Sequence, residues 1–173
     1  MELRVPEGDD RPRHVCAACE RVHYVNPSLV VGTLPVWDGR ILLCRRAIEP
    51  RLGFWTLPSG FLENDETLEQ GAVRETVEEA GASVEIERLH TAFSLPHVNQ
   101  VYLLVLARMT SPGLNPGPES IEARLFSEEE IPWWDLAFRA VEFCLREFVA
   151  DRDTARVHLG TYTRRPGDPW ILG

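Results

Sequence analysis

The chain has 173 residues, of which 44% are hydrophobic, and a formal net charge of −9. This length and apolar content suffice for one main domain with a substantial core, and we find no internal repeat that would indicate more. An acidic chain without a long basic run argues against a broad nucleic-acid surface. We find no apolar stretch of about 18 residues and no leader-like start, so we expect a cytosolic protein without a membrane partner.

The first residues differ in composition from the rest of the chain. Residues 1–13 are charged and contain proline, with too few apolar side chains to pack as an element, so we expect an extended or mobile arm. Cys16 and Cys19 then form a CxxC pair, the spacing by which zinc knuckles place two thiolates on one metal. His14 and His23 are candidate further ligands, but no fourth ligand is identifiable. The sequence therefore favours two free thiols over a complete Zn²⁺ site.

The two remaining cysteines lie in strongly apolar segments. Cys44 and Cys144 do not share a regular disulfide spacing with the CxxC pair. We expect both to be reduced thiols that fill the core.

A hairpin is predicted from residue 28 onward. SLVVGTLPVW and RILLCRR are β-rich, and Asp38-Gly39 between them is a strong hairpin turn signal. The second strand ends in Arg45 and Arg46, just before a glycine-containing loop. Guanidinium groups placed there can bind phosphate oxygens in a bidentate way, and the alternative is an ordinary solvated strand end.

A loop that contains Pro50, Gly53 and Pro58 follows, AIEPRLGFWTLPSGF. Its tryptophan, Trp55, is a candidate to stack on a nucleotide base. Packing beneath the turn is the alternative, and aromatic residues in such positions more often pack.

Residues 60–82, GFLENDETLEQGAVRETVEEAGA, predict a helix that carries a dense group of carboxylates. At 100° per residue, three apolar residues share one stripe: Val73, Val77 and Ala80. Three acidic residues share the opposite stripe: Glu75, Glu78 and Glu79. Like charges at this spacing repel, but they suit a hard divalent cation such as Mg²⁺ or Mn²⁺. The alternative is a solvated acidic helix.

The second half of the chain predicts more strands, a long loop and a helix. SVEIERLHTAFSLPH and NQVYLLVLARM look like neighbouring strands joined around residues 96–99, the second being central. TSPGLNPGPES is a long loop that carries Glu119, and the following strand, IEARLF, carries Glu122. Ser127 is expected to cap a helical turn, and residues 136–150 form an amphipathic helix. The tail from residue 151, with Tyr162, Pro166, Pro169 and Trp170, gives no catalytic signal.

Residues 60–82 resemble the Nudix box, Gx5Ex7REUxEExGU, in which U is aliphatic. Seven residues fall in register: Gly60, Glu66, Arg74, Glu75, Glu78, Glu79 and Gly81. Ala82 fills the last aliphatic position loosely. Thr76 departs from the pattern, because the family prefers Ile, Leu or Val there, and we expect slightly softer packing.

The resemblance extends beyond the box to Nudix FAD and ADP-ribose pyrophosphatases that carry an N-terminal zinc ribbon. The matching phrases include YVNPSLVVG, ILLCRRAIEPRLGFWTLPSGFLE and PGPESIEARLF. The resemblance implies an α/β Nudix fold, an α/β/α sandwich with a mixed β-sheet. It also divides the chain into an arm with a half ribbon (1–27), a Nudix domain (28–160) and a tail (161–173). The first CxxC of the ribbon is not found, and FSLPHVNQ stands where NADH pyrophosphatases have SQPWPFPxS.

The resemblance further implies a metal-dependent enzyme that hydrolyses a nucleoside diphosphate linked to another moiety, with FAD or ADP-ribose as substrate. Metal binding is assigned to Glu75, Glu78 and Glu79, with Mg²⁺ or Mn²⁺ as the cofactor. The catalytic candidates, among which the base is left open, are Glu78, Glu79, Glu119 and Glu122. The substrate-binding candidates are Arg45, Arg46, Trp55 and Arg74.

Other functions remain as alternatives at this point. They are a non-catalytic Nudix-fold dinucleotide sensor, an NADH pyrophosphatase, and a nucleic-acid adaptor acting through the CxxC segment. The retained box carboxylates favour an enzyme over a sensor, and the acidic composition disfavours the adaptor. The expected partner is a small nucleotide, and a homodimer is a further prediction.

Overall fold

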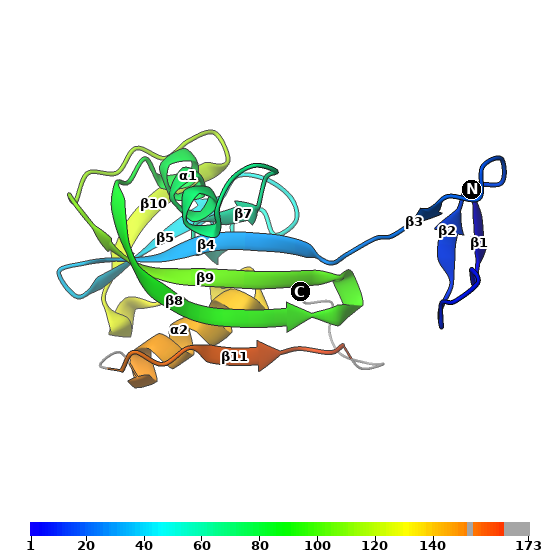
Figure 1. Ribbon diagram of the computed structural model, residues 1–173. Helices are drawn as coiled ribbons and strands as arrows, with labels where there is room; N and C mark the ends of the chain where they lie inside the picture. Colours follow the sequence, from blue (N-terminus) through cyan, green and yellow to red (C-terminus); the bar gives the residue numbers. More distant parts are fainter. Residues whose placement is uncertain (152–153, 165–173) are drawn as a thin grey trace.

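The computed structural model describes residues 1–151 and 154–164, and its main body is a mixed β-sheet between two helices (Figure 1). The strand order in this sheet is β10-β5-β4-β9-β8-β11. The strands of this path are β4 (Ser28–Trp37), β5 (Arg40–Arg46), β8 (Val84–Leu95), β9 (Gln100–Met109), β10 (Ser120–Phe126) and β11 (His158–Thr161). Two short strands lie off the path: β6 (Trp55–Thr56) pairs with β5, and β7 (Ser59–Phe61) pairs with β4.

The predicted hairpin and the predicted strand neighbours are confirmed. β4 and β5 pair antiparallel, with Val36 opposite Ile41, and both residues of the Asp38-Gly39 turn have positive φ. β8 and β9 also pair antiparallel, and a short 3₁₀ helix, η1 (Pro96–Val98), joins them. β9 lies parallel to β4, which makes it a central strand and explains its nearly continuous apolar sequence.

The two α-helices of the described residues cover opposite faces of the sheet (Figure 1). α1 (Leu68–Ala80) packs against β4, β7 and β10, while α2 (Arg139–Asp151) packs against β8 and β11. The layers are therefore α/β/α, as predicted. Two 3₁₀ helices precede α2: η2 (Glu128–Glu130), capped by Ser127 as predicted, and η3 (Trp133–Asp135).

The largest core cluster lies between α2 and the sheet. It joins Leu34, Leu43 and Leu104 of the strands to Leu145 and Phe148 of the helix. A smaller cluster under α1 contains Cys44, and Cys144 belongs to the large one, so both thiols are buried as predicted. Burial raises the pKa of the Cys144 thiol to about 12.

The buried face of α1 differs from the predicted stripe. Ala72, Thr76 and Ala80 face the sheet, whereas Val77 is 50% exposed. The Thr76 hydroxyl lies 2.6 Å from the Thr33 hydroxyl of β4 and donates to the Ala72 carbonyl at 2.7 Å. The threonine therefore forms a buried hydrogen-bonded contact where softer packing was expected, and the helix is rotated so that small residues approach the strands.

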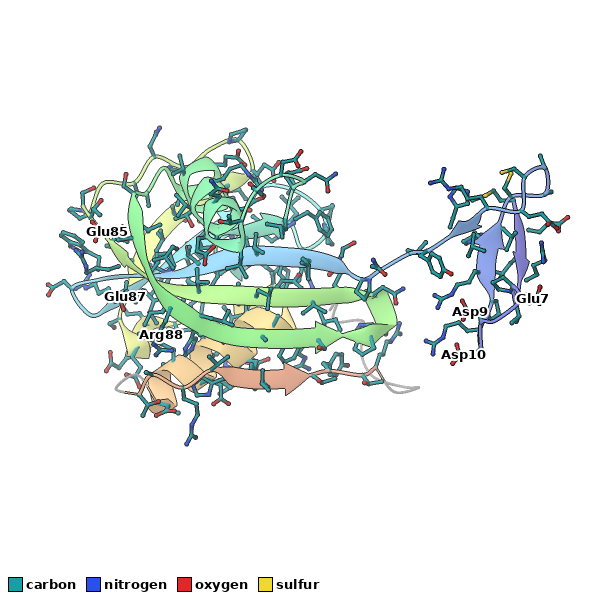
Figure 2. The ribbon with its side chains drawn as sticks, in the orientation of Figure 1. Glu7, Asp9, Asp10, Glu85, Glu87 and Arg88 are labelled. Atoms are coloured by element: carbon teal, nitrogen blue, oxygen red, sulfur yellow. The ribbon has the colours of Figure 1, made fainter. Side chains whose placement is uncertain are left out.

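The N-terminal residues form a small antiparallel sheet, so the expectation of an extended or mobile arm is wrong. Its strands are β1 (Glu2–Arg4), β2 (Arg13–Val15) and β3 (Val22–His23), and it lies apart from the main body (Figure 1). Backbone pairing and polar contacts hold it together around the buried Val15, and Arg13 Nε donates to Asp9 at 2.9 Å. Figure 2 labels Asp9 and Asp10 in the connection between β1 and β2. The composition did not reveal strands that depend on backbone hydrogen bonds more than on a core.

The end of the described chain adds a strand that the sequence did not predict. β11 pairs parallel with β8, with Leu159 opposite Ala92. Pro166, Pro169 and Trp170 of the predicted tail lie outside the described residues. Within residues 1–151 and 154–164, no helix has the length and apolar character needed to cross a membrane.

Candidate active site

Local sequence signals position α1 at both ends. Thr67 and Gln70 form a capping box, in which the Thr67 hydroxyl accepts from the Gln70 N–H and the Gln70 side chain accepts from the Thr67 N–H. Gly81 ends the helix in the left-handed conformation, at φ 61°. These caps fix which turns of the helix carry the box carboxylates.

Gly60 of β7 lets the helix carboxylates approach the sheet. A Cβ at this position would overlap the carboxylate of Glu75. A side chain at residue 60 would therefore displace the Glu75 carboxylate from this position.

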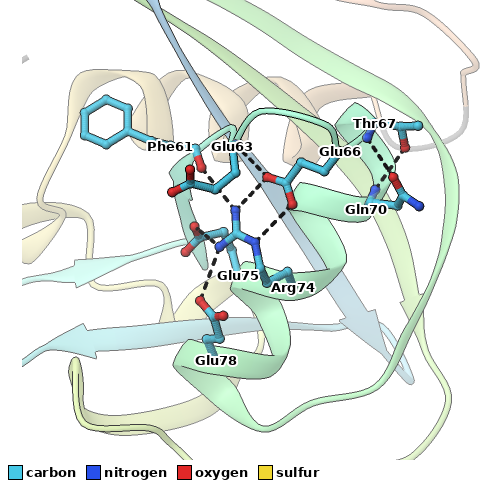
Figure 3. A network of polar contacts seen from close by, with 8 residues as sticks. All are labelled: Phe61, Glu63, Glu66, Thr67, Gln70, Arg74, Glu75 and Glu78. Atoms are coloured by element: carbon cyan, nitrogen blue, oxygen red, sulfur yellow. Dashed lines mark hydrogen bonds and ion pairs between the residues drawn. The ribbon is translucent and has the colours of Figure 1, made fainter.

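Arg74 lies at the centre of the carboxylate cluster (Figure 3). Its Nε and Nη2 donate to the two oxygens of Glu66 at 3.1 and 2.7 Å, and Nη2 also donates to the Phe61 carbonyl at 3.1 Å. Its Nη1 donates to Glu75 at 2.6 Å and to Glu78 at 3.2 Å. All five N–H donors of the guanidinium thus have acceptors within the protein.

Glu79 is the most buried of the box carboxylates, with 6% of its surface exposed. Burial, and next the charge of Glu75, raise the pKa of Glu79 to about 8, although the Ser59 N–H donates to its Oε2 at 3.3 Å. The pKa of Glu75 is also raised, because burial outweighs its hydrogen bond to Arg74. Glu78 is more exposed, at 58% of its side chain.

The long loop between β9 and β10 packs against the end of α1. The Asn115 N–H donates to the Ala80 carbonyl at 2.8 Å, and a Cβ on Gly117 would overlap the Glu78 carbonyl. The Ala47 N–H donates to the carbonyl of Glu119 at 2.8 Å. These contacts bring Glu119 to the box carboxylates, whose raised pKa values include a contribution from its charge.

These elements enclose a cavity of about 800 Å³. Its lining includes six carboxylates but only two arginines, Arg46 and Arg74. The carboxylates are Glu49, Glu63, Glu75, Glu78, Glu79 and Glu119. An apolar wall, made by Val30, Val98, Tyr102 and Phe138, completes the lining with neighbouring backbone and polar groups. The lining therefore combines a dense group of carboxylates with apolar surface.

Six of the predicted site residues line this cavity: Arg46, Arg74, Glu75, Glu78, Glu79 and Glu119. Three do not. Arg45 donates from Nε to the Gly53 carbonyl at 2.9 Å, Trp55 packs edge-on against Phe126 at 4.8 Å, and Glu122 lies opposite Arg45 in the β10–β5 pairing.

The cavity residues fit a hard divalent cation. Their donors are carboxylate oxygens, which suit Mg²⁺ or Mn²⁺, and the raised pKa values of Glu75 and Glu79 indicate negative charge that a cation would neutralise. In the arrangement described here, no set of three or more His, Cys, Asp or Glu side chains within residues 1–151 and 154–164 is spaced for a metal. The Arg74 guanidinium instead bridges Glu75 and Glu78.

The CxxC pair lies away from the cavity, after β2 of the small sheet. Cys16 is half-buried and Cys19 is exposed, and both are free thiols. The pKa of Cys16 is lowered by backbone N–H groups of Ala18 and Cys19 that donate to its sulfur. The turn thus has the N–H to sulfur contacts that stabilise a thiolate.

Sequence reasoning missed several residues of the cavity. Tyr102 and Gln100 lie on β9, and Phe138 precedes α2. They come together only because β4 and β9 are neighbours and α2 crosses beneath them, which no local pattern reveals. The sequence did contain a signal for the pairing of Glu66 with Arg74. Glu66 lies eight residues before Arg74, next to the predicted start of the helix.

Comparisons with known proteins agree with this geometry. A family model described as NUDIX domain matches residues 27–150, and a zinc-ribbon model described as Nudix N-terminal matches residues 1–25. The solved structure of a NUDIX hydrolase from Nitrosomonas europaea is 50% identical, with a TM-score of 0.91 over 94% of each chain.

Two curated relatives are more distant. An ADP-ribose pyrophosphatase from Methanocaldococcus jannaschii is 30% identical over 63% of this chain and 67% of its own length. A NAD-capped RNA hydrolase from Photobacterium profundum is 29% identical over 72% of this chain, which spans only 47% of that relative. Because the domain model covers more than half of the chain and the fold is the α/β/α sandwich expected of it, this protein belongs to the Nudix hydrolase family.

Proposed function

We propose that the protein hydrolyses the diphosphate bond of a nucleoside diphosphate linked to another moiety, with FAD or ADP-ribose as the substrate. The observation that carries the proposal is the cavity itself, whose lining combines the box carboxylates and Arg46 with the apolar side chains of Val30, Val98, Tyr102 and Phe138. A substrate with a diphosphate next to an aromatic base matches both kinds of lining.

The proposed phosphate contact is Arg46. Its side chain lies on the cavity wall, with Nε donating to the Pro50 carbonyl at 2.8 Å and Cζ 5.0 Å from the Phe138 ring centroid. These contacts fix the guanidinium plane, so its remaining N–H groups can donate to phosphate oxygens. Arg74 has no donor left over, so we assign it to positioning Glu75 and Glu78.

The apolar wall would hold the base. Tyr102 and Phe138 offer aromatic surfaces, and Val30 and Val98 fill the space around them. Such surfaces bind any planar ring, which explains why they do not by themselves distinguish an adenine from an isoalloxazine.

Bound Mg²⁺ or Mn²⁺, held by Glu75, Glu78 and Glu79, would supply charge neutralisation for the diphosphate and activation of water. Glu119 faces the same cavity from the opposite loop and is our candidate to orient the attacking water, with Glu78 as the alternative. Water forms a bond to one phosphorus as the bond from that phosphorus to the bridging oxygen breaks. The proton of the water passes to the carboxylate, and FAD would yield FMN and AMP.

A second candidate substrate is a nicotinamide dinucleotide. The similarity to the Photobacterium profundum relative favours it, because that protein is named for NAD-capped RNA. FAD, ADP-ribose and the nicotinamide dinucleotides share an ADP half, so they place the same diphosphate in the same chemical setting.

A substrate panel tests the proposal. FAD, ADP-ribose, NADH, diadenosine polyphosphates and 8-oxo-dGTP are incubated with Mg²⁺ or with Mn²⁺, and products are identified by chromatography. We expect cleavage of FAD, ADP-ribose or NADH to two monophosphates. Cleavage confined to nucleoside triphosphates, or no cleavage of any of these three compounds, would refute the proposal. Two further predictions are a homodimer, which sedimentation tests, and a cytosolic location, which a localisation experiment tests.

A further inference from the structure

A second, smaller cavity of about 290 Å³ lies on the other side of Phe138 from the catalytic cavity, and Phe138 lines both. The walls come from the loop before β6, from η3 and from the first two turns of α2. Its volume is close to the lower limit of about 300 Å³ for small-molecule pockets, so it suits a single base with a phosphate better than a dinucleotide.

The charge of this pocket is opposite to that of the protein. Its lining includes three arginines, Arg51, Arg139 and Arg146, and one carboxylate, Glu142, in a chain of net charge −9. Glu142 accepts from Arg139 at 2.9 Å and from Arg146 at 2.9 Å, which holds both guanidinium groups at the pocket. Positive charge remains in excess there, and the buried Nε of Arg139 has no hydrogen-bond partner among the described residues.

Aromatic rings and Leu136 form the rest of the pocket. Arg146 lies over the ring of Trp133 at 4.6 Å, and Arg51 lies over the ring of Phe54 at 4.9 Å. Trp134 is 96% exposed although it is among the largest apolar side chains. An indole left in water beside arginines offers a stacking surface for a planar ring.

Arginine edges bind phosphate and aromatic faces bind bases, and this pocket presents both at single-nucleotide size. We propose that it is an accessory binding site for a nucleoside 5′-monophosphate group, distinct from the catalytic cavity. Two sources present this group: the far half of a bound dinucleotide that passes Phe138, and a free nucleotide.

The direct test is an equilibrium titration with AMP in EDTA, followed by tryptophan fluorescence. Trp133 and Trp134 line the pocket and report on it, whereas no tryptophan lines the catalytic cavity within the described residues. EDTA disfavours anion binding to the catalytic cavity, because its six carboxylates then lack a counter-ion. Adenosine and inorganic phosphate are titrated in parallel to separate the contributions of base and phosphate.

The chain offers a matched pair of variants, Arg146→Gln and Arg124→Gln. Arg146 and Arg124 are both exposed, each lies 4.6 Å over an aromatic ring, and each pairs with one glutamate. Only Arg146 lines the pocket. We expect saturable binding of AMP with a Kd of about 1 mM or tighter, tighter than that of adenosine or phosphate, weakened about tenfold or more by Arg146→Gln and unchanged by Arg124→Gln. Melting temperatures confirm that both variants are folded.

Steady-state kinetics then show whether the monophosphate group belongs to the bound substrate or to a free nucleotide. If the pocket holds half of the substrate, Arg146→Gln raises KM for the dinucleotide while kcat changes little. If it takes a free nucleotide, added AMP changes the rate of the wild type, and Arg146→Gln removes that response. No saturable binding of AMP in EDTA, or equal weakening by both substitutions, would overturn the proposal. Because the titration needs no turnover, its outcome does not depend on the proposed hydrolysis.

Discussion

Glu119 and Glu122 lie three residues apart, yet only Glu119 faces the catalytic cavity. Pairing with β5 is irregular between Ser120 and Glu122, and Glu122 lies opposite Arg45. The two acids therefore form a matched pair for testing which carboxylate orients water. The sequence predicts that both acids lie near the end of the same loop. It does not predict which of them faces the cavity, because a β-bulge is not visible in local composition.

We predict that Glu119→Gln lowers kcat by about 10²–10⁴ with little change in KM, the usual contribution of a general base. Steady-state kinetics with the preferred dinucleotide measure it. Glu122→Gln is the control and should remain within a factor of a few of the wild type. Should both variants be fully active, Glu78 becomes the candidate base.

The Thr33–Thr76 contact also belongs to the residue scale. Both hydroxyls are fully buried and lie 2.6 Å apart. We predict that Thr76→Val lowers the free energy of unfolding by about 1–3 kcal/mol, because it leaves the Thr33 hydroxyl buried with one partner fewer. The double variant Thr33→Val, Thr76→Val should recover most of this loss. Urea unfolding of the four proteins completes the cycle, and strictly additive losses would contradict the prediction.

Residue identities predicted the box and its acidic character well, because the box is continuous in sequence. They did not predict which side chains would use their hydrogen bonds within the protein. Arg74 was a substrate-binding candidate, but its donors meet Glu66, Glu75, Glu78 and the Phe61 carbonyl. Such a network depends on how β7 and α1 are placed, and that is a tertiary property.

At the scale of elements, the loop before β10 positions Glu119 through Gly117. A Cβ on Gly117 would overlap the Glu78 carbonyl of α1, whereas a Cβ on Gly113 would meet only the Ser111 hydroxyl at 3.8 Å. The loop can pack this closely on the helix only because residue 117 lacks a side chain.

We predict that Gly117→Ala lowers stability by about 1–3 kcal/mol, as overpacking does, and lowers kcat because the loop must move away from α1. Thermal unfolding and steady-state kinetics measure the two effects. Gly113→Ala in the same loop is the control and should change neither. Equal behaviour of the two variants would mean that the loop does not need this close approach.

Elements with strong local patterns were predicted, and those stabilised by distant contacts were not. The β4–β5 hairpin and α2 follow turn chemistry and helical periodicity. β11 has only four residues, and it forms a strand because β8 offers a free edge. The buried stripe of α1 was misassigned because valine is apolar, although the tight packing against β4 favours the smaller alanine and threonine.

For the whole molecule, the buried His90 links stability to pH. Burial lowers the pKa of His90 from its ordinary value of 6.5 to about 4, partly offset by its contact with the Cys144 carbonyl at 3.3 Å. Between these values the unfolded chain binds a proton that the folded chain does not. The stability that neutral His90 confers is therefore complete above pH 6.5 and is lost as the pH falls toward 4.

We predict that His90→Gln reduces the fall in unfolding free energy between pH 7 and pH 4 by up to about 3 kcal/mol relative to the wild type. The comparison is made by urea unfolding at both pH values, so that carboxylates common to the two proteins cancel. An identical fall in both proteins would contradict the assignment.

The central claim for the molecule is that its function depends on the box carboxylates acting with a divalent cation. Glu79 tests this claim most directly, because it is buried, lines the cavity and has a pKa raised to about 8 by burial and by Glu75. Glu69 lies exposed in the first turn of the same helix and provides the control.

The decisive measurement is the Mg²⁺-dependent rate of dinucleotide hydrolysis by Glu79→Gln, with the melting temperature recorded in EDTA. We predict a loss of about 10²-fold or more in kcat/KM. The melting temperature at pH 7 should hold or rise, because folding no longer has to bury and protonate a carboxyl whose pKa is raised to about 8. Glu69→Gln should retain its activity. If Glu79→Gln kept most of the wild-type rate in Mg²⁺, the metal-binding role of the box in this protein would be contradicted.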